Sequence, residues 1–268
     1  MAYSALMRVM VEAARKAGRS LSRDFGEVQN LQVSMKGPGD YVSQADRKAE
    51  EIIFTELSRA RPGYSFLMEE RGAVEGEDSQ HRWIVDPLDG TTNFLHGIPI
   101  FAISIALERQ GQLQAALVYN PAMDELYTAE RGGGAFMNDR RLRVAGRTKL
   151  SDSVIGTGIP HLGRGHHGNA LIELRNVMGE VSGIRRMGAA ALDLAYVAAG
   201  RLDGFWESGL SPWDMAAGLL LIREAGGFAS DREGGQDMLE SGNVVAGNET
   251  IHRVLLRQLR KPLTPRPA

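Results

Sequence analysis

The sequence contains no cysteine, which excludes disulfide bonds, thiolate zinc sites and cysteine nucleophiles. Carboxylate, carbonyl and hydroxyl ligands remain, and these suit hard cations such as Mg²⁺ or Mn²⁺. No apolar run approaches the roughly 20 residues that a membrane-spanning helix needs. The N-terminus also lacks the basic region and apolar stretch of an export signal. We therefore expect a cytoplasmic protein that does not associate with membranes.

An excess of charge of one sign is missing as well. The 31 Lys and Arg residues and 33 Asp and Glu residues give a formal net charge of -2, so there is no general electrostatic reason to bind nucleic acid. A hydrophobic fraction of 43% in 268 residues supports a sizeable core. These values predict a single globular body of two closely packed halves.

The N-terminal half, residues 1–147, is expected to combine two helices with a sheet. Apolar residues recur at helical spacing over residues 4–21 and 44–60. A polar, breaker-rich loop is expected from Met35 to Asp40. Alternating apolar residues over 98–144 predict a meandering antiparallel sheet, with Gly132 to Gly134 as a hairpin turn rather than a phosphate cradle.

The C-terminal half, residues 148–260, alternates short apolar strands with helices, which predicts an α/β arrangement with a substantially parallel sheet. Strands are expected at 154–158, 184–187, 203–206 and 244–246. Helices are expected at 168–179, 190–199, 213–225 and from 248 onward. Residues 261–268 are expected to be a disordered tail. The predicted class is therefore α/β, with an α+β N-terminal half and an α/β C-terminal half.

The most informative segment is Asp86-Pro-Leu-Asp-Gly-Thr-Thr-Asn-Phe94, which directly follows the apolar run from Trp83 to Val85. A strand is expected to end on two carboxylates three residues apart, which repel each other unless a cation lies between them. The Gly-Thr-Thr turn after them could start a helix, whose free N–H groups suit an anion. A cation site beside an anion site is what a metal-dependent phosphatase requires.

Other acidic residues are placed where they could join a metal site, although each could instead have an ordinary structural role. Glu69 and Glu70 follow an apolar strand, so at most one of them faces a given site; alternatively both lie on a solvated turn. Asp214 falls in the first turn of a predicted helix, where it would also serve as a cap. Asp46 could instead pair with Arg47 or Lys48.

Taken together, these segments resemble the inositol monophosphatase family of metal-dependent, lithium-sensitive sugar phosphatases. The resemblance covers roughly residues 4–258 and preserves the family's order and spacing in four segments: Asp40–Asp46, Glu69–Glu70, Trp83–Phe94 and Trp213–Gly218. It implies a layered αβαβα sandwich of the inositol monophosphatase and fructose-1,6-bisphosphatase type. It also implies a homodimer, with metals held where the two halves meet.

The resemblance assigns ligands for two or three Mg²⁺ ions, with Mn²⁺ as an alternative. A first ion would be held by Glu69, Asp86 and the carbonyl of Leu88. A second would be held by Asp86, Asp89 and Asp214. A third, weaker ion would rest on Glu69 and waters, which places Glu69 in the catalytic group.

The resemblance also assigns the catalytic and phosphate-binding roles. Thr91 and Asp46 would orient and deprotonate the attacking water. The N–H groups of Gly90 and Thr91 would receive the phosphate. These roles are physically coherent, since one ion lowers the pKa of its bound water while the other stabilises the leaving oxygen. No side-chain nucleophile is needed, in agreement with the absence of cysteine.

For the substrate, the resemblance points to a sugar or polyol. Glu207 corresponds to the family residue that accepts hydrogen bonds from hydroxyl groups, and Gly188 and Ala190 correspond to the segment lining the inositol ring. Ala189 stands where relatives usually carry Ser or Thr, which puts any contact through that hydroxyl in doubt. Lys36 matches a loop residue that closes over the metals; alternatively it is a solvent-exposed lysine.

The leading hypothesis is therefore a phosphatase that hydrolyses myo-inositol monophosphate and similar polyol phosphates to inositol and phosphate by metal-activated water attack. Fructose-1,6-bisphosphate, histidinol phosphate and NADP⁺ are alternative substrates. A second hypothesis belongs to another class: residues 185–207 resemble the bacterial branch of the family, some members of which bind the transcription machinery of ribosomal RNA operons. In that case the protein would be a regulatory partner.

Overall fold

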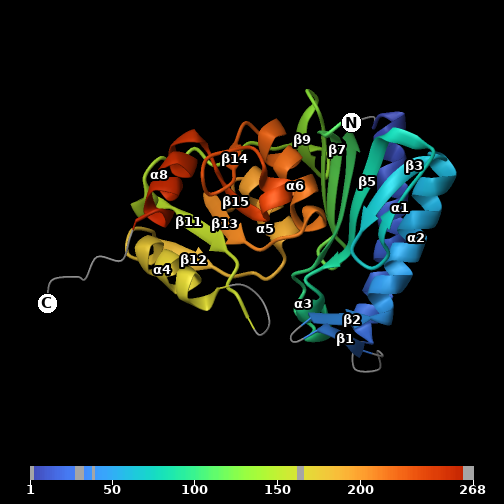
Figure 1. Ribbon diagram of the computed structural model, residues 1–268, viewed down its shortest axis with the longest axis horizontal. Helices are drawn as coiled ribbons and strands as arrows, with labels where there is room; N and C mark the ends of the chain where they lie inside the picture. Colours follow the sequence, from blue (N-terminus) through green and yellow to red (C-terminus); the bar gives the residue numbers. More distant parts are fainter. Residues whose placement is uncertain (1–2, 28–32, 38–39, 162–165, 262–268) are drawn as a thin grey trace, which may run out of the picture.

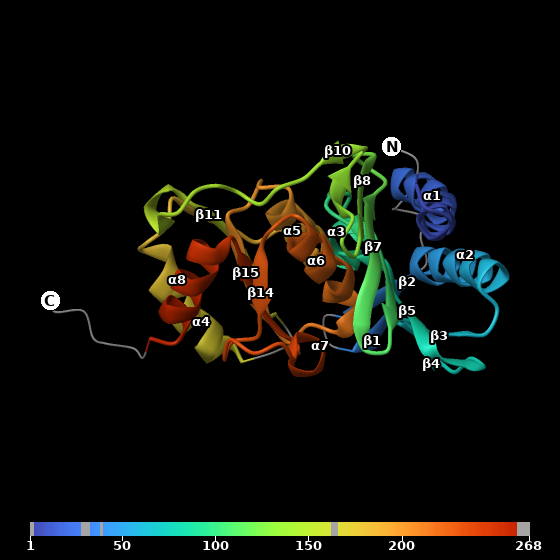
Figure 2. The same cartoon turned by 90° about the horizontal axis from the view of Figure 1, so that it is seen from above.

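The computed structural model describes residues 3–27, 33–37, 40–161 and 166–261. Two sheets and the helices that cover them form five layers (Figures 1 and 2). One helix pair covers the outer face of the larger sheet, a second pair lies between the sheets, and a third covers the outer face of the smaller sheet. The predicted αβαβα sandwich is confirmed. Within the described ranges, every helix is too short or too polar to cross a bilayer.

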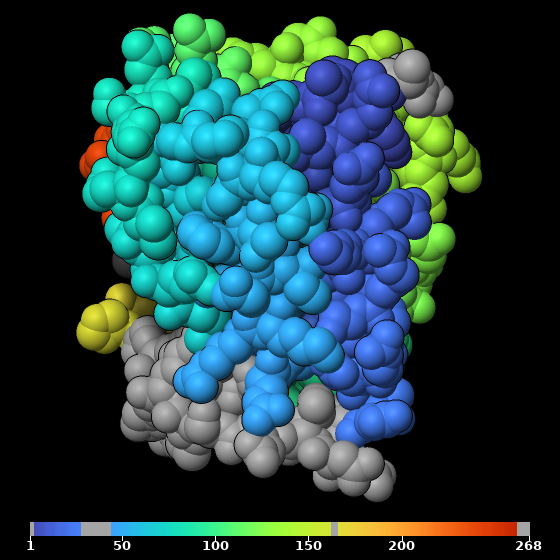
Figure 3. All heavy atoms as spheres, turned by 90° about the vertical axis from the view of Figure 1, so that its right-hand side faces the viewer, coloured from blue at the N-terminus to red at the C-terminus, as the bar shows by residue number. Residues whose placement is uncertain are grey.

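The outer helix pair consists of α1 (Ala5–Gly26) and α2 (Gln44–Ala60), as the helical spacing predicts. The hydroxyl of Ser4 caps α1 by accepting the N–H of Met7 at 3.0 Å. Each helix buries one apolar stripe against the larger sheet. Figure 3 shows the two helices side by side over this face of the molecule.

In the order of the chain, α1 and α2 are separated by a short antiparallel ribbon of β1 (Val33–Gly37) and β2 (Asp40–Ser43). The loop predicted from Met35 to Asp40 is therefore wrong over most of its length. Strand pairing here depends on backbone hydrogen bonds, which a pattern of polar side chains does not reveal. Lys36 belongs to β1, and its side chain lies outside the described part of the structure.

The larger sheet has the strand order β10-β9-β8-β7-β6-β5-β3-β4, and only β3 and β5 pair in parallel. Its strands are β3 (Tyr64–Met68), β4 (Gly72–Val74), β5 (Asp78–Asp89), β6 (Ala102–Arg109), β7 (Gln112–Asn120), β8 (Glu125–Glu130), β9 (Gly134–Met137) and β10 (Arg140–Arg141). Both faces are buried. In β6, Ile103 and Ile105 pack toward α1 and α2, whereas Ala102 and Ala106 face the inner helices. The small alanines allow those helices to approach the sheet closely.

The turn from Gly132 to Gly134 joins β8 to β9. The carboxylate of Glu224 accepts the N–H groups of Gly132 and Gly134, both at 2.8 Å. A side chain of the protein itself thus occupies these donors, and the predicted hairpin turn is confirmed.

The smaller sheet has the order β12-β11-β13-β15-β14. Its strands are β11 (Val154–Thr157), β12 (Gly183–Arg185), β13 (Gly204–Ser208), β14 (Phe228–Ser230) and β15 (Asn243–Gly247). Strand β11 pairs in parallel with β12 and β13, but β15 pairs antiparallel with β13 and β14. The substantially parallel sheet is therefore only partly confirmed, and the three-residue β14 is too short to stand out as an apolar pattern.

Helices α5 (Ala190–Ala198) and α6 (Pro212–Glu224) lie between the two sheets, and α4 (His167–Met178) and α8 (Glu249–Leu259) cover the outer face of the smaller sheet. The short elements are α3 (Thr91–Leu95), η2 (Leu150–Asp152) and α7 (Met238–Ser241). A Cβ added at Gly218 would lie 2.4 Å from the Cβ of Leu194, so α5 and α6 are in close contact. Residues 262–268, most of the predicted tail, lie outside the described residues.

Candidate metal centre and active site

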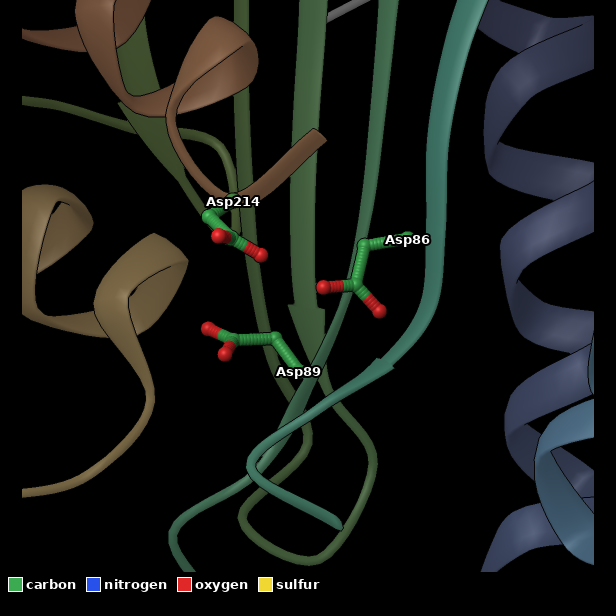
Figure 4. A group of neighbouring side chains, drawn as sticks. All are labelled: Asp86, Asp89 and Asp214. Carbon is green, nitrogen blue, oxygen red and sulfur yellow. The ribbon is translucent and has the colours of Figure 1, made fainter. Parts of the chain in front are cut away.

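Three aspartates converge where the inner helices meet the end of β5. Asp86 and Asp89 belong to β5, and Asp214 lies in the first turn of α6. One carboxylate oxygen from each lies within 4.8 Å of the others, and Figure 4 shows the side chains pointing toward one another. The family resemblance implied this grouping of residues from two segments that lie far apart in the chain.

An irregularity in β5 brings Asp86 and Asp89 together. On a regular strand, residues three apart point to opposite faces. Here Asp86 pairs with Ser104 and Asp89 with Ala102, so three steps along β5 match two along β6. The extra residue forms a β-bulge, which turns both carboxylates to the same side. Pro87 lies inside this bulge, where the lack of an N–H donor costs no regular ladder bond.

Each of the three carboxylates accepts one backbone N–H group. Leu88 N donates to Asp86 Oδ1 at 2.9 Å, and Ser211 N donates to Asp214 Oδ2 at 2.7 Å. Ala191 N, in the first turn of α5, donates to Asp89 Oδ2 at 2.7 Å. These bonds fix the orientation of the carboxylates before any cation is considered. Asp214 is thus both a helix cap and a member of the cluster, so its two interpretations are compatible.

The cluster is electrostatically unfavourable by itself. Burial raises the pKa of Asp86 well above its ordinary value, and the charges of Glu69, Asp89 and Asp214 raise it further. Burial likewise raises the pKa of Asp89, with the charge of Asp214 as the next cause. A divalent cation would remove this repulsion, and carboxylate oxygens are the ligands that Mg²⁺ prefers. The donor set therefore fits a hard cation.

Glu69 approaches the cluster from the turn after β3. It lines the same cavity as the aspartates, and its charge raises the pKa of both Asp86 and Asp89. The neighbouring Glu70 is not among the cavity-lining residues, and its backbone N–H donates to Glu50 Oε2 at 2.8 Å. Both residues lie on the turn after β3 rather than on the strand, so strand alternation does not apply to them, but Glu69 alone of the two lines the cavity.

The turn after β5 brings Thr91 and Asp46 together. Thr91 Oγ1 lies 3.0 Å from Asp46 Oδ1 and 3.1 Å from the carbonyl oxygen of Leu88. Thr91 lines the cavity, whereas Asp46, in the first turn of α2, is fully buried behind it. Gly90 has a positive φ of 91°, and a Cβ there would lie 2.9 Å from the carbonyl oxygen of Ile100. Glycine is therefore required at position 90 both for its conformation and for space.

A cavity of about 1170 Å³ extends from this cluster. Most binding pockets measure about 300–1000 Å³, so a sugar phosphate fits with room to spare. Its wall includes the predicted substrate residues Glu207, Gly188 and Ala190, together with Ala189. The predicted site residues with described side chains are thus brought to one place, with Asp46 reaching it through Thr91.

Two residues that the sequence analysis did not single out connect the halves of the site. The side-chain Nδ2 of Asn93 donates to the carbonyl oxygens of Ile100 at 2.7 Å and Met187 at 2.8 Å. Ser104, the partner of Asp86 in the sheet, donates through its hydroxyl to the carbonyl oxygen of Trp213 at 3.0 Å. Both side chains are buried. Asn93 falls within the Asp86–Phe94 segment, which could have indicated it, whereas Ser104 is only a small polar residue within an apolar strand pattern.

Comparison with known proteins agrees with this geometry. The sequence model that describes the inositol monophosphatase family matches residues 2–263 of this chain. A Mesorhizobium japonicum protein named inositol-1-monophosphatase is 82% identical over 266 residues, which cover 99% of this chain and 100% of that protein. A Pseudomonas aeruginosa protein named Nus factor SuhB is 46% identical over 264 residues, 97% of each chain. The crystal structure of extragenic suppressor protein suhB from Bartonella henselae superimposes with a TM-score of 0.95 at 69% identity, covering 97% of this chain and 100% of that one.

Proposed function

The chain belongs to the inositol monophosphatase family, and from that premise we propose that it is a Mg²⁺-dependent phosphomonoesterase. Its substrates are myo-inositol monophosphate and similar small polyol phosphates, and its products are the free polyol and inorganic phosphate. The observation that carries the proposal is the convergence of Asp86, Asp89 and Asp214 within 4.8 Å at the wall of a large cavity.

Two or three Mg²⁺ ions, or Mn²⁺ as an alternative, fit the oxygen donors of the centre. Glu69, Asp86 and the carbonyl of Leu88 would hold one ion, and Asp86, Asp89 and Asp214 a second. When bound, the ions supply the positive charge that activates a water and stabilises the leaving oxygen. The third, weaker position would depend on Glu69.

Around the ions, the side chains of the chain position the reactants. Thr91 Oγ1 orients the attacking water and accepts its proton, while the Thr91 hydroxyl passes its own proton to Asp46 Oδ1 at 3.0 Å. Thr91 thus ends neutral, Asp46 ends protonated, and the water attacks phosphorus as hydroxide. The N–H groups of Gly90 and Thr91 donate to the phosphate oxygens, which the missing Cβ of Gly90 allows to approach. The short helix α3 that follows adds little dipole of its own.

Other residues of the cavity wall select the substrate. Glu207 accepts hydrogen bonds from the hydroxyl groups, and Gly188 and Ala190 border the ring. Ala189 offers no hydroxyl for a further contact. The role that the resemblance implies for Lys36 stays a prediction. Fructose-1,6-bisphosphate, histidinol phosphate and NADP⁺ are alternative substrates of the same chemistry.

Hydrolysis rates across a panel of phosphomonoesters test this proposal. With Mg²⁺ in excess, we expect the highest kcat/KM for myo-inositol monophosphate, and none above background for Asp86→Asn, which serves as the blank. Calorimetric titration of Mg²⁺ into wild type and into Asp86→Asn measures the metal site without turnover. A wild-type protein that releases phosphate from no monoester refutes the proposal.

A second candidate function is that of a regulatory partner of the ribosomal RNA transcription machinery. Relatives named Nus factor SuhB, 46% and 42% identical, favour it, although the relative named inositol-1-monophosphatase is far more similar. A pull-down with purified RNA polymerase and its elongation factors tests this role. Failure to retain any of them would refute it, whatever the phosphatase activity.

Homodimerisation, lithium sensitivity and a cytoplasmic location are expected from the family resemblance and the sequence. They stay predictions. Light scattering checks the first, and a lithium titration of the phosphatase reaction checks the second.

A further inference from the structure

Gly158 stands at the end of β11, directly beside Glu207. Strands β11 and β13 run in parallel, with Gly156 paired to Phe205 and Thr157 to Trp206. One further step in the same register places Gly158 next to Glu207. Neighbouring strands are about 4.8 Å apart, so a long side chain on one strand can lie across the backbone of the other.

The alternation of β13 sends Glu207 toward the metal centre. Phe205 packs in the core between the two sheets, and Trp206 packs in the core on the outer side. Because side chains alternate along a strand, Glu207 shares the inner face with Phe205. Glu207 and Gly158 both line the cavity that contains the three aspartates.

The carboxylate of Glu207 occupies the space that a side chain at position 158 would need. A Cβ added to Gly158 would lie 1.8 Å from Glu207 Oε1 and 1.9 Å from Glu207 Cδ, an overlap that no real contact shows. Gly158 does not have a left-handed backbone, so its conformation alone would accept any residue. Only the space taken by Glu207 explains the need for glycine here.

At Gly156, two residues earlier, side chains of the core likewise occupy the space that a side chain would need. A Cβ there would lie 2.8 Å from Leu202 Cδ1 and 3.0 Å from Phe205 Cδ2. Two glycines on one face of β11 thus accept two consecutive inner-face side chains of β13. Gly156 accepts an apolar ring, and Gly158 accepts the charged group that faces the substrate.

We propose that Gly158 determines substrate specificity by seating the Glu207 carboxylate against the backbone of β11, where it can accept hydrogen bonds from the hydroxyl groups of a polyol phosphate. This inference rests on the proposed function and extends it to a positioning residue. Any side chain at position 158 displaces the carboxylate. Because that carboxylate is the end of a flexible side chain, it moves before the fold does.

Gly158→Ala tests the inference with two esters that differ in hydroxyl groups. For myo-inositol monophosphate, we expect KM to rise about tenfold or more, because hydrogen bonds to a charged acceptor are lost. For phenyl phosphate, which has no hydroxyl group to offer, we expect kcat/KM to change less than about twofold. In a Glu207→Ala background, Gly158→Ala should add no further effect on either ester.

Gly146→Ala is the matched control, because a Cβ at that exposed loop glycine meets nothing within 4 Å. A crystal structure of Gly158→Ala gives a readout independent of turnover and should show the Glu207 carboxylate moved away from residue 158. Equal losses on both esters, or an unmoved carboxylate, overturn the assignment of Gly158. A wild-type protein inert toward both esters overturns the proposed function itself, and the specificity claim with it.

Discussion

Replacing Asp89 with Asn should make the metal-free protein more stable while abolishing its phosphatase activity. The substitution removes one charge from a cluster whose carboxylate oxygens lie within 4.8 Å of one another. Asn has nearly the same shape, and its amide oxygen can still accept the N–H of Ala191, which Asp89 accepts at 2.7 Å. The main change is therefore electrostatic, as is common where a functional site stores unfavourable interactions.

The size of the effect follows from the separation of the charges. Two unit charges 4.8 Å apart repel by about 3.5 kcal/mol at an effective dielectric constant of about 20. Burial and neighbouring charges raise the pKa of Asp89, which makes its protonation easier in the folded state and the relief smaller than this figure. We expect the free energy of unfolding to rise by about 1–3 kcal/mol in EDTA at pH 7.5, roughly 2–10 °C in Tm.

The pH dependence gives the sign of the effect a separate check. The pKa of Asp89 is higher in the folded than in the unfolded state. The stability that this difference contributes is therefore fully present at pH values below the pKa of Asp89 in the unfolded state. This contribution is lost as the pH rises through the pKa of Asp89 in the folded state, where the carboxyl loses its proton. The advantage of Asp89→Asn in EDTA should therefore shrink from pH 7.5 to pH 4. With excess Mg²⁺ the order reverses, since only wild type gains the full binding energy.

Urea denaturation measured in EDTA and in Mg²⁺ provides the assay. Asp152→Asn, an exposed residue of η2 whose side chain accepts the Ser151 hydroxyl, controls for the chemical change. The reasoning is refuted if Asp89→Asn is no more stable than wild type in EDTA, or if both proteins gain equally from Mg²⁺.

Substitutions at three further positions separate chemistry from architecture. Thr91→Ala should lower kcat about 100-fold, whereas Thr91→Ser should retain most activity. Mg²⁺ should still raise the Tm of Thr91→Ala, because Thr91 orients the water rather than holding the metal. A loss of this stabilisation by Mg²⁺ would contradict that role. Asn93→Ala should lower the free energy of unfolding by about 2 kcal/mol, because the partly buried carbonyls of Ile100 and Met187 lose their donor. An unchanged urea midpoint would refute this. Glu224→Ala should lower the free energy of unfolding by about 1–3 kcal/mol, because the N–H groups of Gly132 and Gly134 lose their acceptor. It should leave kcat/KM unaltered, and reduced catalysis would show that the turn does more than close the hairpin.

Most individual helices and strands and the Asp86–Asp89 pair could be predicted from the residues themselves, whereas the layered arrangement and the place of Asp214 in the acidic centre were implied by the family resemblance. Helices α1 and α2 carry a clear 3.6-residue period, and β6 alternates bulky and small residues, so periodicity identifies both. The motif containing Asp86 and Asp89 ends an apolar run, and it does lie at the end of a strand. These features depend on local chemistry, which sequence patterns record.

Other features depended on contacts that no local pattern encodes. The strands β1 and β14 are short and lack a distinctive period, and the direction of β15 is set by its neighbours rather than by its own residues. The bond from Ala191 N to Asp89 joins residues 102 positions apart through a backbone group that any amino acid would offer. The lack of space for a side chain at Gly158 is due to Glu207 on another strand, a contact that the residues around Gly158 do not indicate.

The bulge between Asp86 and Asp89 has a consequence for how this segment tolerates changes in length. Removing one residue there would restore regular pairing of β5 with β6, and a residue two positions from Asp86 in a regular strand sits about 6.8 Å farther along the chain. Adding one residue would rotate the second carboxylate away again. The number of residues between Asp86 and Asp89 is therefore constrained by the geometry of the acidic cluster, in addition to the identity of its side chains.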